Sequence, residues 1–218
     1  MNRRLFLKFT FGNSLLIYGA MAKVPHKKPL AVLLGDDIKI GYQDYVKKEL
    51  HGIANIWTPE INCQGTEHIL THIESWLHDI DVDLIHLNAG HFDLGRINNI
   101  NQTPLDRYAL NIEQIIKLLH KIKPQASIVW ASTTPVHDVY SAKKTSKIQY
   151  FNEDVIRYNA AAFQVAERMG IGLNDLYTLT MESGGPNLLD ENGRDFRDNG
   201  NRHLAQWVAY TIKLFAGL

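Results

Sequence analysis

Four side chains that could bind a metal ion or take part in acid–base chemistry lie near the ends of two apolar segments. Asp36 follows one segment, and His86, His91 and Asp93 lie in or just after another. Histidine and aspartate together suit Zn²⁺ or another first-row metal. Structural roles explain them better: His86 alternates along a strand as a core residue does, and both aspartates can accept hydrogen bonds from loop backbone. We therefore predict neither a metal nor a cofactor here.

The elements that must position these residues alternate between strands and helices. Short apolar runs predict buried parallel strands at residues 29–34, 54–57, 82–87, 127–131 and 172–176. Apolar residues at three- and four-residue spacing predict helices at residues 42–50, 66–78, 104–122, 153–169 and 203–215. No Pro/Gly/Ser-rich linker and no repeat interrupts the alternation. We predict one α/β domain over residues 23–218, a three-layer α/β/α sandwich with a mostly parallel central sheet, of the flavodoxin-like type.

Ligands bind to such sheets where the strands reach their carboxyl ends. The loops of interest are therefore residues 35–40, 62–66, 88–94 and 132–137.

These loops resemble the sequence blocks of the SGNH (GDSL) hydrolases. Gly35-Asp36-Asp37-Ile38 stands where the family has Gly-Asp-Ser-Ile, and Cys63-Gln64-Gly65-Thr66 where it has its second block. Residues 88–94 (NAGHFDL) resemble the third block, Gly-x-Asn-Asp, which a bacterial subgroup writes Asn-x-Gly-Leu-His-Asp-Leu. Segments 133–136, 157–159 and 174–177 also resemble that subgroup. The resemblance extends in the family's order from about residue 30 to the C-terminus.

The resemblance implies a fold and a chemistry. In the family, a serine activated by a histidine attacks an ester carbonyl, and donors around the oxyanion assist. By position, Gly65 would lend a backbone N–H to the oxyanion hole, and Asn88, Gly90 and Asp93 would lie on the ligand side. The family and the expected location imply a small-molecule or glycan ligand, a carbohydrate or an acylated carbohydrate.

The chain departs from the family pattern at each critical residue. Asp37 replaces the nucleophilic serine, and Phe92 replaces a polar side chain of the third block. The last block, Asp-x-x-His, is missing, and two registers compete for it. One places Asp195 at the histidine position and Asn192 at the aspartate position. The other uses His203, with Asp198 five residues before it as the acid; His203 adjoins an apolar run and so fits a helix better. We favour the first register.

These replacements leave three interpretations. A carboxylate at Asp37 cannot become an alkoxide and would repel a developing oxyanion, so ordinary serine-esterase activity is not expected. We favour a protein that keeps the fold and binds its ligand. In a glycosidase-like alternative, Asp37 and Asp195 form a carboxylate pair at roughly 4–6 Å, near the ~5–5.5 Å of retaining glycosidases. A divergent esterase using His203 is the third. Whether the chain is an enzyme stays open.

The N-terminus forms a separate segment. Arg3-Arg4-Leu5-Phe6-Leu7-Lys8 resembles the twin-arginine export signature, and Ala20-Met21-Ala22 is a small-x-small cleavage site. The apolar run between them is shorter than the ~20 residues that a spanning helix needs. We predict a twin-arginine-type signal peptide over residues 1–22. The mature protein is then expected in the periplasm or secreted, without stable membrane insertion.

Composition indicates a globular domain and argues against nucleic acid as a partner. The chain has 45% hydrophobic and 21% charged residues, which is typical of a globular domain with a full core. Lys+Arg and Asp+Glu number 23 each, so no basic footprint for nucleic acid is present. A single cysteine, Cys63, cannot form an internal disulfide.

Overall fold

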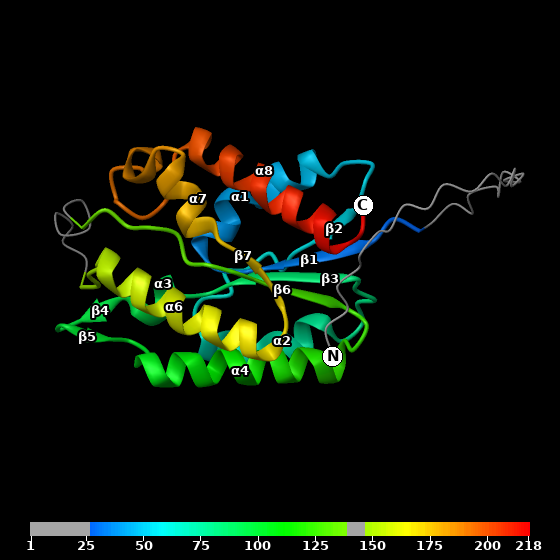
Figure 1. Cartoon of the computed structure of the whole chain (residues 1–218), viewed down its shortest axis with the longest axis horizontal. Coiled ribbons are helices and arrows are strands. Elements are labelled where there is room, and N and C mark those ends of the chain that lie inside the picture. The colour runs from blue at the N-terminus through cyan, green and yellow to red at the C-terminus, as the bar shows by residue number, and fades with distance from the viewer. Residues whose placement is uncertain (1–26, 139–146) are drawn as a thin grey trace, which may run out of the picture.

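Five parallel strands form the central sheet of the computed structural model, which describes residues 27–138 and 147–218 (Figure 1). Their order is β2-β1-β3-β6-β7, and every neighbouring pair is parallel. The strands are β1 (Leu30–Leu34), β2 (Asn55–Trp57), β3 (Leu84–Asn88), β6 (Ser127–Ala131) and β7 (Gly172–Asn174). The predicted signal segment, residues 1–22, lies outside the described residues.

Helices cover both faces of this sheet. On one face, α1 (Asp37–Glu49) packs against α8 (Asp198–Phe215). On the other lie α2 (Thr66–Leu77), α4 (Leu105–Ile122) and α6 (Asn152–Met169), as Figure 1 shows. The predicted three-layer α/β/α sandwich is confirmed.

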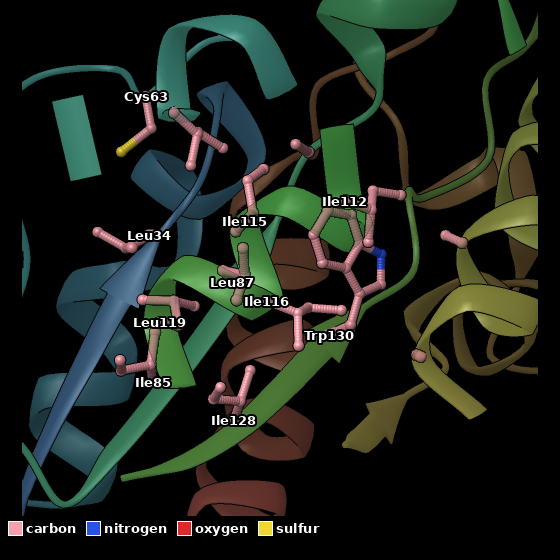
Figure 2. Close-up of a cluster of buried hydrophobic side chains, with 14 of the residues drawn as sticks. Leu34, Cys63, Ile85, Leu87, Ile112, Ile115, Ile116, Leu119, Ile128 and Trp130 are labelled. Atoms are coloured by element: carbon pink, nitrogen blue, oxygen red, sulfur yellow. The ribbon is translucent and has the colours of Figure 1, made fainter. Parts of the chain in front are cut away.

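Two apolar clusters fill the space between the layers. The larger lies under α2, α4 and α6, where Trp130 of β6 is surrounded by isoleucines and leucines such as Ile112, Ile116 and Leu87 (Figure 2). The smaller lies under α1 and α8 and includes Leu33 and Val208. Strand residues alternate between the two clusters because successive side chains of a strand point to opposite faces. Burial on both faces explains why these strands are continuous apolar runs.

Two helices begin earlier than predicted because their first turns carry polar residues. The helix predicted from residue 42 begins at Asp37, since Asp36 accepts a hydrogen bond from the Ile38 N–H at 3.1 Å. The helix predicted from residue 203 begins at Asp198, whose negative charge suits a first turn. The last strand ends at Asn174 because Asp175 caps the next helix, α7 (Leu176–Glu182).

The remaining elements are short. A single turn, α3 (His91–Leu94), lies in the loop after β3, and a small hairpin follows it, β4 (Arg96–Ile97) and β5 (Ile100–Asn101). A 3₁₀ turn, η1 (Gly185–Leu188), follows α7. Among the described residues, no helix combines the length and apolar character that a membrane span requires.

Candidate functional site

The carboxyl ends of β1 and β3 bring the first and third sequence blocks together. Asp36 follows β1, and its Oδ1 accepts hydrogen bonds from the Ile38 N–H at 3.1 Å and from Asn88 Nδ2 at 3.2 Å. Gly35 allows this approach, because a Cβ on it would lie 2.2 Å from Asn88 Oδ1. The predicted site residue Asn88 therefore positions the start of α1, on which Asp37 stands.

Asp37 is held by two donors from distant parts of the chain. Arg194 Nη2 donates to its Oδ2 at 2.7 Å, and Asn62 Nδ2 donates to its Oδ1. The Asp37 side chain remains 34% exposed, so a ligand can reach it. Both carboxylate oxygens thus accept charged or amide hydrogen bonds, which stabilise the negative charge.

Arg194 joins the two predicted site carboxylates. Its Nε donates to Asp195 Oδ1 at 3.1 Å, and its Nη1 donates to the Tyr150 hydroxyl at 3.1 Å. Its guanidinium carbon also lies 5.2 Å from the centre of the Tyr150 ring. Burial opposes the charge, but Tyr150, Asp195 and Asp37 outweigh it and raise the pKa of Arg194 above its ordinary value. The group is a permanent cation between two carboxylates; we call Asp37, Arg194 and Asp195 the charged row.

A tight turn at residues 190–195 holds Asp195 beside Arg194. The Asn192 side chain accepts from the backbone N–H groups of Arg194 and Asp195, both at 2.8 Å, and donates to Asp195 Oδ2 at 2.7 Å. Asn192 and Asp195 are the positions that the favoured register assigns to the last family block. Their side chains are in contact, and Arg194 links Asp195 to Asp37.

His203 lies elsewhere. Its Nε2 is 2.6 Å from Ser183 Oγ, and the Trp207 indole N–H points to the same nitrogen at 3.3 Å. These partners belong to α8 and to the end of α7. Asp198, the acid of the alternative register, instead accepts from Tyr45 and Arg202.

A buried Asp36–His91 pair adjoins the charged row. Asp36 Oδ2 and His91 Nδ1 lie 4.0 Å apart, and neither atom has a hydrogen-bond partner within the described part of the chain. His91 Nε2 is 3.1 Å from the Thr134 carbonyl, which only accepts, so the neutral ring carries its proton on Nε2. Burial lowers the pKa of His91 to about 3 and raises that of Asp36. The unprotonated Nδ1 of His91 therefore lies beside Asp36, 4.0 Å from its Oδ2.

Gly65, Gly90 and Asp93 shape the loops beside the row. Asp93 accepts from the Thr66 N–H at 3.1 Å and from Thr66 Oγ1 at 2.6 Å, which fixes the start of α2. Burial raises the pKa of Asp93 to about 6, and the side chain is fully buried. A Cβ on Gly90 would lie 1.9 Å from Thr133 Oγ1. Asp93 thus lies buried behind Thr66 and Gly65 and holds that loop in place.

Of the four residues considered for a metal, Asp36 and His91 are neighbours, and His86 has a different partner. His86 is buried, and its Nε2 accepts from Asn174 Nδ2 at 3.0 Å, which is the core role expected of it. Within residues 27–138 and 147–218, no three His, Cys, Asp or Glu side chains are grouped so that they could hold a metal ion.

Comparisons with known proteins concern the fold. No protein-family model matches the sequence, and no curated protein matches it. A lipase/acylhydrolase from Enterococcus faecalis superposes with a TM-score of 0.71 at 17% identity, over 85% of this chain and 95% of that one. An acetyl xylan esterase, AlAXEase, gives 0.68 at 15%, over 84% and 99%. A GDSL-like lipase from Bacteroides thetaiotaomicron gives 0.67 at 15%, over 85% and 88%.

The fold is that of the GDSL-like acylhydrolases. Asp36 and Asp37 follow β1, and Asn88 ends β3, so the first and third sequence blocks lie at the carboxyl ends of neighbouring strands.

Sequence reasoning missed three site residues: Asn62, Tyr150 and Arg194. The only signal for Arg194 was its position beside Asp195. Asn62 begins the loop 62–66 that was expected near the site, but nothing marked its side chain as a donor to Asp37. For Tyr150 the sequence held no signal, because it meets Arg194 across 44 residues.

Proposed function

We propose that this chain is a divergent member of the GDSL (SGNH) hydrolase family that binds a carbohydrate or acylated carbohydrate and lacks ordinary serine-esterase activity. One observation carries the proposal. Asp37, at the nucleophile position, is hydrogen-bonded to Arg194 and Asn62, and no histidine among the described residues bonds to it. A carboxylate held in this way is a ligand-binding group and cannot be activated as an alkoxide.

The polarity of the charged row fits a hydroxyl-rich ligand. Asp37 and Asp195 accept hydrogen bonds, Arg194 donates them, and all three are partly exposed. A sugar hydroxyl donates and accepts, so neighbouring hydroxyls can bond both kinds of group. The Tyr150 ring beside Arg194 adds apolar surface. An acetyl xylan esterase among the proteins of similar fold supports this ligand class.

The glycosidase-like alternative needs one protonated carboxyl group. Like charges that share a site keep one acid protonated through mutual repulsion. Here the Arg194 guanidinium lies between Asp37 and Asp195 and offsets that repulsion. The arrangement therefore argues against an acid–nucleophile pair. An esterase using His203 is also less favoured, because its partners are Ser183 and Trp207.

Ligand binding tests the proposal directly. We expect the protein to bind acetylated xylo-oligosaccharide in isothermal titration calorimetry, and Asp37→Ala or Asp195→Ala to weaken binding at least ~tenfold, since each removes a charged acceptor. Asp198→Ala, which removes an exposed acid on α8, is the matched control and should bind like the wild type. Unchanged affinity in folded Asp37→Ala and Asp195→Ala would exclude the charged row as the binding site.

Export is a further part of the proposal, supported by Arg3, Arg4 and the Ala20-Met21-Ala22 site. Replacing both arginines with lysine is expected to leave the precursor in the cytoplasm with residues 1–22 attached. Fractionation and intact mass measure this, with Lys8→Arg as the control that keeps the pair. Normal amounts of the shortened protein outside the cytoplasm in the double variant would refute twin-arginine export.

A further inference from the structure

A fully buried lysine contacts the loop that follows β2. Lys39 lies in the first turn of α1 and has no solvent-exposed surface, although lysine is almost never fully buried unless it is paired. Its hydrogen-bond partners among the described residues are all uncharged oxygens. Burying a charge without a counter-ion costs free energy, so core packing alone does not explain a lysine at this position.

Four oxygen atoms surround the Lys39 amino group. Its Nζ lies 3.0 Å from Thr58 Oγ1 and 3.2 Å from Gln43 Oε1. The backbone carbonyl oxygens of Pro59 and Ile61 lie at 3.4 and 3.5 Å from the same nitrogen. An ammonium group has three donors and no acceptor, so surroundings made of oxygen atoms suit its charged form. Three of the four oxygens belong to the loop between β2 and α2, so this one cation links the loop to α1.

The same loop carries Asn62, whose side chain donates to Asp37. Lys39 binds the backbone carbonyl just before Asn62. The backbone N–H just after it, from Cys63, donates to the Gly35 carbonyl at 3.0 Å. The chain is therefore held on both sides of Asn62, once by the lysine and once by the residue that follows β1.

We propose that Lys39 is a positioning residue, whose ammonium group holds Asn62 against Asp37. One charge attracts all the loop oxygens around it, whereas a neutral side chain of the same length would leave two buried carbonyls without this donor. Without the cation the loop relaxes, and Asn62 loses its contact with Asp37. The consequence for ligand affinity rests on the proposed function, but the contact between Asn62 and Asp37 does not.

Lys39→Met tests this role, because methionine keeps the length and most of the volume of the side chain and removes the charge. In nuclear magnetic resonance spectra of the whole protein, we expect the Asn62 side-chain NH₂ signal to move toward that of a solvent-exposed asparagine. The proton bonded to Asp37 should exchange with water at least ~tenfold faster, as expected when a hydrogen bond to a charged group is lost. Circular dichroism shows whether the variant is folded.

A double-mutant cycle separates positioning from a general effect on the fold. With acetylated xylo-oligosaccharide as the ligand, Lys39→Met should weaken binding at least ~threefold in the wild-type background. In the Asn62→Ala background the same change should alter the affinity less than ~twofold, because the group that Lys39 positions is already absent. Equal losses in both backgrounds would show a purely structural lysine and overturn the inference. If the wild type binds no ligand, the proposed function fails, and the Asn62 signal alone decides the inference.

A milder variant and a remote lysine complete the test. Thr58→Val keeps the side-chain volume and removes one of the four oxygens, so it should shift the Asn62 signal in the same direction as Lys39→Met but less far. It supplies the result if Lys39→Met does not fold. Lys123→Met removes a lysine that donates to the Ile80 carbonyl at 2.6 Å, at the amino ends of the strands, and should leave the Asn62 signal unchanged. A wild-type Asn62 signal in the folded variants of Lys39 and Thr58 overturns the inference.

Discussion

Replacing Arg194 with leucine is expected to lower the free energy of unfolding by about 2–3 kcal/mol at neutral pH. The change leaves Asp37 and Asp195 without the cation between them, and removing one partner of a fully buried pair costs about 3–5 kcal/mol. The Arg194 side chain is 19% exposed, and the two carboxylates are 34% and 38% exposed, so water offsets part of that cost. Urea denaturation measures the difference.

An exposed ion pair supplies the matched control. Arg202 contacts Asp198 at 2.7 Å, the same separation as Arg194 to Asp37. The side chains of Arg202 and Asp198 are, however, 62% and 64% exposed. Arg202→Leu should therefore cost less than about 1 kcal/mol. Adding Asp37→Asn to Arg194→Leu should restore part of the loss, because it removes one of the two unpaired charges. Equal, small losses for both arginines would mean that the charged row contributes nothing to stability.

Acid is expected to destabilise the fold through His86. Burial lowers the pKa of His86 to about 4, against about 6.5 for an unfolded histidine. Between these values the unfolded chain binds more protons than the folded one, so stability falls as the pH falls. From pH 7 to pH 4 this histidine alone should cost about 3 kcal/mol of unfolding free energy.

A comparison of variants isolates that histidine. Burial raises the pKa of Asp36 and Asp93, which act in the opposite sense over the same range, so the wild-type profile alone is not diagnostic. His86→Gln should lose about 3 kcal/mol less than the wild type between pH 7 and pH 4. The exposed His120→Gln is the control and should follow the wild type. Parallel pH profiles for wild type and His86→Gln would show that the pKa of His86 is the same in the folded and unfolded states and would contradict the prediction.

The alternation of elements could be predicted because burial dictates it. β1, β3 and β6 are covered on both faces, so each is a continuous apolar run that stands out in the sequence. The helix starts at Asp37 and Asp198 were missed, because the first turn of each helix carries polar residues outside the apolar periodicity. The one-turn α3 is too short to show any periodicity.

Of the charged row, the two carboxylates could be predicted from the sequence and the arginine could not. Resemblance to a family placed Asp37 and Asp195 at one site, and the structure brings them to the same guanidinium. The cation between them could not be predicted, since Arg194 meets Asp37 across 157 residues and Tyr150 across 44. No local sequence pattern predicts such contacts, because they form only when the folded sheet brings distant loops together.

Ester turnover is the most direct test of the central claim, that Asp37 holds a nucleophile's position without its chemistry. Purified protein should hydrolyse acetylated xylo-oligosaccharide and short acyl esters no faster than buffer, because the proposed function has no serine nucleophile and oxyanion donors alone are worth only ~10²–10³ in rate. Asp37→Ser should gain nothing, since among the described residues Arg194 and Asn62 bond to Asp37 and no histidine does. Turnover by the wild type that disappears in Asp37→Ala would contradict the account.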